Sequence, residues 1–486
     1  QYKEQMKIEG NVIVSFEERK TLIKNGLNDK AVNLSNQLTP INDEDLLDEV
    51  TALVEYPNVL AGKFESKFLE VPQECLILTM KANQKYFPLI DKNNKLANQF
   101  LIVSNVSPKN SNLIIQGNEK VIRPRLSDAE FFYNQDKKKP LKDYLSQLQH
   151  IVYHNKLGTQ SERSERVKTI ASLIVKNLNQ SELLDAVLLA SNLSKADLST
   201  NMVGEFPELQ GVMGRYYALN EKISEEVAFA IEDHYKPRFS GDTLPRSLVG
   251  DIVAVADKIE TLIGLFSIGE KPTGDKDPFA LRRQVIGIIR ILTEKNISLN
   301  LNTIISDSIK ATKLSEPKEL NSFIYDRISN FFKDQGYGAL DIEAVLAIDS
   351  GLISEIPKRL NAIKEFSQLP ESKDLASANK RVGNILKKAD FKSALKIDPA
   401  LLKDTAEVNL YKTLDLVDAE ARKEYLTNNY SGSLKLLCKL KNPIDQFFND
   451  VMVNVEDESL KMNRLALLEK LYSAMNLVAD LSKLSS

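Results

Sequence analysis

The chain has 486 residues, enough for about three domains of ordinary size, each with its own buried core. Hydrophobic residues make up 43% and charged residues 27%, and 19 glycines and 17 prolines are too few for a collagen-like or low-complexity protein, so the composition indicates globular domains. The 64 lysines and arginines nearly balance 67 acidic residues, and the net charge of -3 excludes the general basic excess of many non-specific nucleic-acid binders. Any contact with RNA or DNA must therefore come from local patches.

Cysteines and long apolar runs are scarce. Cys75 and Cys438 lie far apart and have no CxxC spacing for a thiolate metal site or a disulfide framework, so we expect a reducing, cytoplasmic location. No apolar run approaches the roughly 20 residues of a membrane span, and we expect no membrane association. The chain begins with Gln1 instead of Met, which predicts a truncated or processed N-terminus.

The segment up to about residue 117 predicts an α+β domain. Four short runs rich in β-branched or aromatic residues have the length of strands. Asp91, Asn93 and Asn94 separate two of them and indicate a hairpin-like connection. The runs are "NVIVSF" (11–16), "CLILTMKAN" (75–83), "KYFPLI" (85–90) and "QFLIVSNV" (99–106).

From about residue 118 the hydrophobic periodicity becomes helical and stays so to the end. Apolar residues recur at steps of three and four between 247 and 266, which is typical of one face of a helix. Asp277 as N-cap and Pro278 at the first helical position predict the start of the next helix. A polar stretch at 369–373 indicates a boundary, and "NPID" (442–445) a further helix start. The chain thus divides into regions 1–117, 118–295, 296–372 and 373–486.

The glycines in "GLFSIGEKPTGDKDP" (264–278) have the separation of a phosphate-binding loop. Glu270 stands where the loop lysine belongs, and a helix precedes the segment instead of a strand, so a turn between two helices is the better interpretation. Nucleophile elbows, HExxH and GxGxxG after a strand are absent, and we assign no catalytic residue.

Arg283, Gly287 and Arg290 fall on one face of the helix that follows this turn. Arginines beside a glycine could cradle an RNA phosphate or clamp a carboxylate, and they could equally form an internal ion-pair network that holds two helices together. The sequence favours the structural role.

Asp197, Asp233, His234 and Asp257 form a possible divalent-metal set of the His/Asp type that phosphohydrolases use. The order Asp-His lacks the adjacent His-Asp pair of such sites, and the first histidine ligand has no secure candidate. Solvated or salt-bridged carboxylates are the favoured interpretation, and we assign no metal ligand.

Two basic stretches could bind RNA. In "VIRPRLSDAEFFYNQDKKKP", Arg123 and Arg125 precede three aromatic residues and a lysine run, a combination that offers phosphate contacts and ring faces for unpaired bases. "KRVGNILKK" (380–388) repeats the basic pattern and makes Lys380 and Arg381 further candidates. The alternative for both is the solvated edge of a core helix.

Several long strings match one family pattern in the same order. They are "LLDEVTALVEYPNVLAGKFESKFLEVPQECLILTMKANQKYFPLID" (46–91), "RLSDAEFFYNQD", "HNKLGT", "KADLSTNMVGEFPELQGVMGRYYA" (195–218), "ADKIETLIGLFSIGEKPTGDKDPFALRRQVIGIIRIL" (256–292), "KRVGNIL" and "PIDQFFNDVMVNVEDESLKMNRLALL" (443–468). With these strings the chain strongly resembles the β subunit of bacterial α2β2 glycyl-tRNA synthetase. The family's usual N-terminal region, with its Glu-Glu-Leu-Pro type string, is missing.

The resemblance implies a subunit of an ATP-dependent glycine-tRNA ligase. The separate α subunit would use ATP and Mg to activate glycine, whereas this chain would bind and position tRNA(Gly), hold no cofactor and not activate glycine alone. The absence of an adenylation motif agrees with this division of labour. The implied fold is multidomain and mainly α, with the α+β N-terminal domain, an HD-like helical domain and a C-terminal all-α domain like the DALR anticodon-binding domains.

On this mapping, five residues lie on the helices nearest the anticodon: Asp445, Phe447, Phe448, Asn463 and Arg464. Arg464 is the strongest single candidate, because it borders an apolar stripe where a solvated cation is not expected. Its guanidinium could reach a base edge or a phosphate, or could pair with Asp445.

Two other functions stay open from the sequence. An independent HD-type metal-dependent phosphohydrolase requires a bound divalent metal, although the ligand set looks incomplete and favours a tRNA-docking scaffold instead. A purely helical assembly scaffold would bind tRNA(Gly) and unrelated RNA equally poorly.

Overall fold

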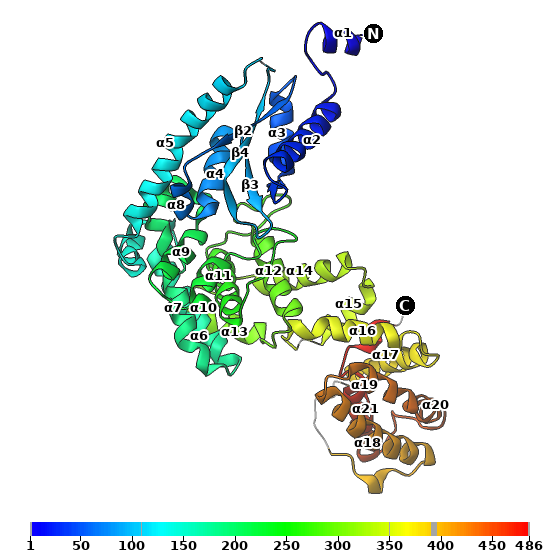
Figure 1. The fold of residues 1–486 in the computed structure, drawn as a ribbon. Coiled ribbons are helices and arrows are strands. Elements are labelled where there is room, and N and C mark those ends of the chain that lie inside the picture. The colour runs from blue at the N-terminus through cyan, green and yellow to red at the C-terminus, as the bar shows by residue number, and fades with distance from the viewer. Residues whose placement is uncertain (1, 108, 349, 390–395, 485–486) are drawn as a thin grey trace. The chain divides into compact units, whose positions relative to one another are not determined.

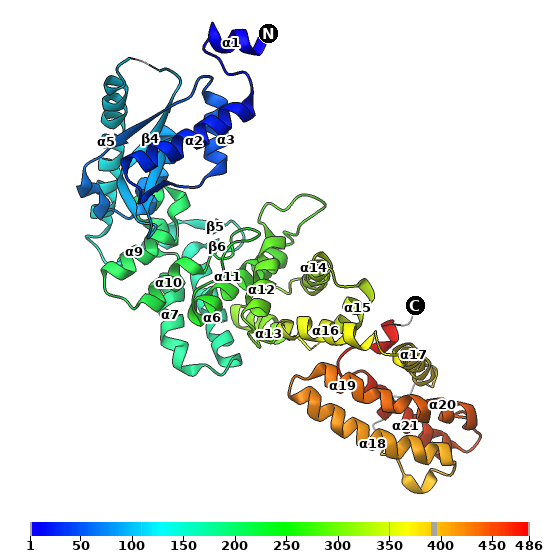
Figure 2. The same cartoon turned by 45° about the vertical axis from the view of Figure 1, so that its right-hand side comes forward.

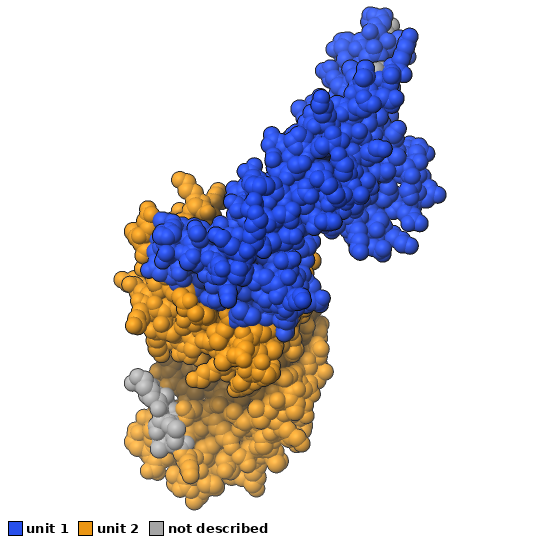
Figure 3. Space-filling view, turned by 60° about the vertical axis from the view of Figure 1, so that its left-hand side comes forward, with its two compact units in different colours: residues 1–154, 158–164, 189–232 blue, residues 155–157, 165–188, 233–486 orange. Residues whose placement is uncertain are grey.

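The computed structural model describes residues 2–107, 109–348, 350–389 and 396–484. The chain divides into two compact units (Figure 3). Unit 1 comprises residues 1–154, 158–164 and 189–232, and unit 2 comprises residues 155–157, 165–188 and 233–486. The described helices and strands make the protein mainly α, with an α+β N-terminal region, which confirms this part of the predicted fold class (Figure 1). The prediction of helices alone after residue 117 is wrong, because residues 152–154 and 158–159 pair as strands.

Unit 1 contains a four-stranded antiparallel sheet with the order β1-β3-β4-β2 and a small hairpin of β5 and β6. Its elements are α1 (Tyr2–Ile8), α2 (Phe16–Leu34), β1 (Leu38–Pro40), α3 (Glu44–Leu53), β2 (Asn58–Lys63), α4 (Gln73–Gln84), β3 (Phe87–Asp91), β4 (Leu96–Ser104), α5 (Asn112–Asp136), β5 (Val152–His154), β6 (Gly158–Thr159), α8 (Asn201–Glu205) and α9 (Val212–Asn220). The division between the units falls within α6 (Gln160–Asn177), α7 (Leu184–Leu193) and α10 (Glu225–Asp233).

The sheet of unit 1 has an apolar layer on each face. Leu101 packs in one cluster with Ile23 and Leu27 of α2 and with residues of α3. Phe100 points to the other face, because successive strand residues alternate, and its ring lies 4.7 Å from that of Tyr86. The hairpin predicted between the two strands is confirmed, since β3 pairs with β4.

Two of the predicted strand runs are wrong. Residues 11–16 contain no strand, because the Ser15 hydroxyl accepts the backbone N–H of Glu18 and so caps α2 from Phe16 onward. The run 75–83 lies inside α4, whose buried residues Cys75, Leu76, Thr79 and Met80 follow a helical spacing of three and four. A short continuous apolar run fits a buried helix as well as a strand.

Unit 2 is helical. Its helices are α11 (Leu248–Ser267), α12 (Leu281–Glu294), α13 (Leu301–Thr312), α14 (Leu320–Asp334), α15 (Ala339–Ala347), α16 (Ile356–Phe366), α17 (Ser372–Lys388), α18 (Thr405–Leu426), α19 (Tyr430–Leu437), α20 (Lys441–Asp450) and α21 (Glu458–Met475). Every residue of α11 from Val249 to Phe266 is buried, so the helix has no solvated face and Asp257 is buried with the rest. Among the described residues, no helix combines the length and apolarity needed to cross a membrane.

Four predictions about helix ends in unit 2 have clear outcomes. Residues 268–280 link α11 to α12, as predicted. The predicted start of the second of these helices at Pro278 is wrong, because α12 begins at Leu281. Asp277 still acts near this end, since its carboxylate accepts the backbone N–H groups of Leu281 and Arg282. Residues 367–371 separate α16 from α17, and α20 begins at the predicted "NPID" segment.

Candidate nucleic-acid interface

Helix α17 displays three faces, and the spacing of its residues explains them. Leu375, Asn379 and Val382 form the buried face. Lys380, Asn384 and Lys387 recur at steps of four and three and line one cleft, whereas Arg381, Ile385 and Lys388 follow the same steps one residue later and line another. Adjacent residues in the sequence therefore serve two different clefts. Figure 2 shows α17 with α18 to α21.

We call the second of these the aromatic cleft. It has a volume of about 700 Å³, within the range of small-molecule and single-nucleotide sites. Its lining comes from α17, the end of α20, the following loop and the start of α21, and consists of Arg381, Ile385, Lys388, Ala389, Phe448, Asn449, Asp450, Val451, Met452, Val453, Asn454, Lys461 and Leu465. The lining therefore contains three cations (Arg381, Lys388 and Lys461) and one carboxylate (Asp450), and most of its other side chains are apolar.

Arg381 and Phe448 make the most distinctive contact in the aromatic cleft. The Arg381 guanidinium carbon lies 4.0 Å from the centroid of the Phe448 ring. Arg381 is exposed and Phe448 is half-buried, so the planar cation remains open to a further flat group. Guanidinium planes and aromatic rings are the surfaces on which unpaired bases stack.

We call the other cleft the lysine cleft. Its volume is about 620 Å³, and its lining consists of Lys380, Gly383, Asn384, Leu386, Lys387, Tyr472, Ser482 and Lys483. Lys380, Lys387 and Lys483 are exposed, and none of the lining residues is acidic. Cationic side chains around a concave surface attract phosphate groups.

Arg464, the strongest single candidate from the sequence, is buried and fully engaged within the protein. The residue is only 5% exposed. The guanidinium pairs with the buried carboxylate of Glu407 and, at 2.8 Å, with Asp404, while Nη1 donates to the backbone carbonyl of Met452 at 2.6 Å. Asp445 instead pairs with Lys441, at 3.3 Å. The geometry favours the structural alternative, in which Arg464 holds the loop that walls the aromatic cleft.

Asn463 likewise has a structural role, because it holds the backbone at Asp398. Its side-chain carbonyl accepts the backbone N–H of Asp398 at 2.7 Å, and its amide donates to the Asp398 carbonyl at 3.1 Å. Phe447 is fully buried in the core, with its ring 5.5 Å from that of Phe448. Of the five anticodon-domain candidates, Phe448 lines one of the two clefts defined above.

Arg283 and Arg290 hold a loop against α12. Arg283 donates to the backbone carbonyl of Arg238 at 3.2 Å, and Arg290 donates to that of Asp242 at 3.0 Å and pairs with Glu294 at 2.7 Å. The space beside Gly287 is filled, because a Cβ there would lie 2.7 Å from the side chain of Lys258. This geometry agrees with the structural alternative.

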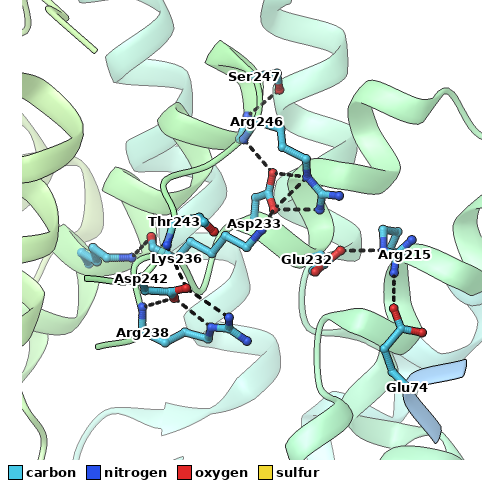
Figure 4. A network of polar contacts seen from close by, with 12 residues as sticks. Glu74, Arg215, Glu232, Asp233, Lys236, Arg238, Asp242, Thr243, Arg246 and Ser247 are labelled. Atoms are coloured by element: carbon cyan, nitrogen blue, oxygen red, sulfur yellow. Dashed lines mark hydrogen bonds and ion pairs between the residues drawn. The ribbon is translucent and has the colours of Figure 1, made fainter. Parts of the chain in front are cut away.

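The same loop contains its own ion pair, which Figure 4 shows as Arg238 turned toward Asp242. Burial alone raises the pKa of Asp242, but hydrogen bonds from the side chain and backbone of Arg238 outweigh it and lower the pKa to about 2. The carboxylate is therefore ionised throughout the physiological range, so its pairing with Arg238 is not lost by protonation there.

The possible metal set is not brought together as a site. Asp233 pairs with Arg246 at 2.8 Å and with Lys236 at 2.9 Å (Figure 4). Burial raises its pKa, yet these cations hold the pKa below the usual value. Asp197 accepts the backbone N–H groups of Gly211 and Gly214. Among the described residues, no group of three or more His, Cys, Asp or Glu side chains could hold a metal ion.

The basic and aromatic segment of unit 1 lies on α5. Arg123 is exposed and pairs with Glu65 at 2.6 Å, and Arg125 is exposed. Phe131 is 57% exposed, whereas Tyr133 is buried and carries Lys137 over its ring at 4.2 Å. A separate pair of contacts in this unit joins Arg215 to Glu74 and Glu232 (Figure 4).

Sequence reasoning missed Lys461, Lys483 and Asp450, which reach the clefts from outside the two basic stretches. Their sequence surroundings carry no signal, because tertiary packing brings them to α17. The spacing of Lys380, Asn384 and Lys387 was visible as a helical face and could have predicted the lysine cleft's first wall.

Comparison with known proteins defines the class. Residues 375–481, which contain both clefts apart from Ser482 and Lys483, match the DALR anticodon binding domain. The class is therefore that of aminoacyl-tRNA synthetase chains with a helical anticodon-binding module. Residues 1–347 match the model of the glycyl-tRNA synthetase beta subunit, and the chain belongs to this family.

Full-length similarity to curated relatives agrees. The glycine-tRNA ligase beta subunit of Methylobacillus flagellatus is 55% identical over all of this chain, which covers 69% of that protein. The corresponding protein of Delftia acidovorans is 53% identical, with the same coverage of each chain. That of Dechloromonas aromatica is also 53% identical, and the chain covers 70% of it.

Proposed function

We propose that the chain binds tRNA(Gly) and positions it for ATP-dependent glycylation at the active site of a separate α subunit. Family membership supports the ligase role. The single observation that carries the site is the Arg381–Phe448 contact within a cationic cleft of the anticodon-binding module. We infer that this cleft takes an unpaired nucleotide of the anticodon loop.

The aromatic cleft has the parts that such a nucleotide needs. The Arg381 guanidinium and the Phe448 ring offer flat faces for stacking. Lys388 and Lys461 add positive charge for the flanking phosphates. Asp450 provides a carboxylate that accepts from the exocyclic amine of a base, and the irregular loop after α20 adds amide groups.

The complete enzyme belongs to this proposal as well. We infer an α2β2 assembly in the cytoplasm, in which ATP and Mg are used on the α subunit and this chain contributes no catalytic residue. The division into regions 1–117, 118–295, 296–372 and 373–486, with an HD-like second region, is likewise a proposal. A metal-dependent phosphohydrolase is not favoured, because Asp233 is held by Arg246 and Lys236.

Two substitutions in the full chain test the site. Arg381→Ala and Phe448→Leu each remove one stacking surface, which is worth roughly 1–3 kcal/mol per base, so affinity for tRNA(Gly) should fall about 5- to 150-fold in filter-binding titrations. Arg422→Ala is the matched control, since Arg422 is an exposed arginine of α18 that lies outside both clefts and pairs with Asp418.

Glycylation with added α subunit gives the second measurement. The two cleft variants should raise KM for tRNA(Gly) without changing glycine-dependent ATP turnover by the α subunit. Equal tRNA affinity for wild type, Arg381→Ala and Phe448→Leu would remove the aromatic cleft from the proposal. Failure of the wild-type chain to bind tRNA(Gly) at low salt would overturn the tRNA-binding role itself.

A further inference from the structure

We propose that the lysine cleft is a second, sequence-independent binding site, which takes phosphodiester groups of the same tRNA strand whose bases enter the aromatic cleft. This inference rests on the proposed function and deepens it. Nothing in the family match assigns a role to this cleft, and it lies on a different face of α17 from the aromatic cleft.

The charge of the cleft is its first supporting observation. Lys380, Lys387 and Lys483 contribute three positive charges and no carboxylate belongs to the lining. Within the described part of the chain, the ion pairs include no partner for Lys380 or Lys387. Lys483 pairs with Glu343 at 2.8 Å, but both side chains are about half exposed, and such a pair contributes little and exchanges readily for a phosphate.

The surface between the lysines is also suited to a polar, non-planar ligand. Gly383 allows the ring of Tyr472 to lie against α17, since a Cβ at this position would come within 3.0 Å of the ring. Asn384 and Ser482 add neutral polar groups to the lining. Lysines provide compact point charges without the planar fork that favours base edges, so the site can hold phosphate oxygens but read no sequence.

Helix α17 links this cleft to the aromatic cleft. Lys380 precedes Arg381 and Lys387 precedes Lys388, so each of two helical turns presents one cation to each cleft. Seven residues correspond to about 10 Å along the helix axis. Successive phosphates of a stacked strand rise by roughly 3.4 Å, so one strand following α17 can place phosphates at both lysines while its bases turn toward Arg381.

The test uses the full chain and a double substitution, Lys380→Ala with Lys387→Ala. We expect affinity for tRNA(Gly) to fall about tenfold at moderate salt, and the slope of log affinity against log salt to decrease by roughly two, one for each lost phosphate contact. The loss should be equal for tRNA(Gly) and for a tRNA(Gly) with substituted anticodon-loop bases. Replacing both lysines by arginine should restore most of the binding.

Matched controls separate the site from general charge. Lys373→Ala with Lys412→Ala removes the same charge from exposed positions of unit 2 outside both clefts. Equal effects of the two double variants would overturn the proposal, and so would a loss of binding for Lys380→Ala with Lys387→Ala that depends on the anticodon bases. Thermal unfolding of both variants checks that the fold is intact.

Inorganic phosphate distinguishes the source of the ligand. Millimolar phosphate is compared with chloride at equal ionic strength. Phosphate should raise the melting temperature of wild type no more than that of the variant with Lys380→Ala and Lys387→Ala. Specific stabilisation of wild type would mean a free-anion site and would overturn the phosphodiester assignment. If wild type and the variant with Lys380→Ala and Lys387→Ala bind tRNA(Gly) equally well, the assignment of the lysine cleft is overturned, whereas the proposed tRNA-binding function remains.

Discussion

Helices α12 and α17 both carry basic residues beside a glycine, yet they use them in opposite ways. On α12, Arg283 and Arg290 donate to backbone carbonyls of the loop at 238–242, and Lys258 fills the space beside Gly287. On α17, the cations stand around two open clefts, and Gly383 makes room for an aromatic ring. What a basic helix face can bind depends on whether its donors already have acceptors within the protein.

Arg464 provides the sharpest way to test this distinction, because it is a buried cation in the same module as the exposed Lys380, Arg381 and Lys387. Arg464→Met should lower the free energy of unfolding by roughly 3–5 kcal/mol, since it leaves the fully buried Glu407 without its cation. Urea denaturation monitored by circular dichroism measures the change.

A double variant serves as the control for Arg464. Arg464→Met with Glu407→Gln removes both charges and should recover part of the lost stability. Unchanged stability of Arg464→Met, accompanied by a loss of tRNA affinity, would contradict the structural role and return Arg464 to the RNA-contacting residues.

A pH titration is the next test of this comparison, because α11, which packs against α12, contains a buried carboxyl group. Burial raises the pKa of Asp251 to about 7, Lys295 opposes the shift, and the Asp233 carboxylate adds to it. The folded protein therefore keeps this carboxyl protonated where the unfolded chain has lost the proton. Stability should fall by roughly 1.4 kcal/mol per pH unit from about pH 4 to 7 from this group alone, and then level off.

Asp251→Asn isolates that contribution. The free energy of unfolding of the variant, relative to wild type, should increase as pH rises from about 4 to 7 and stay constant above it. Hydrogen exchange at pH 8 should show the gain in α11 and not in α17 to α21. A difference between variant and wild type that does not change with pH would sink this assignment.

The smallest expected effect comes from comparing Arg283→Ala with Arg381→Ala. Loss of the bond from Arg283 to the Arg238 carbonyl should cost about 1 kcal/mol of stability and leave tRNA(Gly) affinity unchanged. Arg381→Ala should do the reverse. Equal losses of tRNA affinity would break the distinction between the two helices.

Much of this organisation was predictable from the sequence, and the exceptions have physical causes. Helical periodicity predicted α11, and turn residues predicted the β3–β4 hairpin. The run 75–83 was misassigned because a continuous apolar segment does not distinguish a strand from a buried helix. The basic stretch at 380–388 was identified as a candidate, but its division into two clefts depends on Phe448, Lys461 and Lys483, which only tertiary packing brings near.

Arg464 shows the same limit from the other side. Its position beside an apolar stripe indicated that its charge must be satisfied, but the sequence could not say by which group. The groups that pair with Arg464 are the carboxylates of Asp404 and Glu407, which lie about 60 residues earlier at the start of α18. Glu407 also completes a capping box there. Partners at that separation leave no local pattern.

The ion pairs of Arg464 also limit which substitutions this sequence can accept during evolution. Glu407 has no exposed surface and pairs with the buried Arg464, so neither of these two residues can change charge alone at low cost. The side chain of Asp404 is 49% exposed, so its charge can be lost at little cost. We therefore expect positions 407 and 464 to be inherited as a pair and replaced together, whereas positions 380 and 387 can exchange lysine for arginine one at a time.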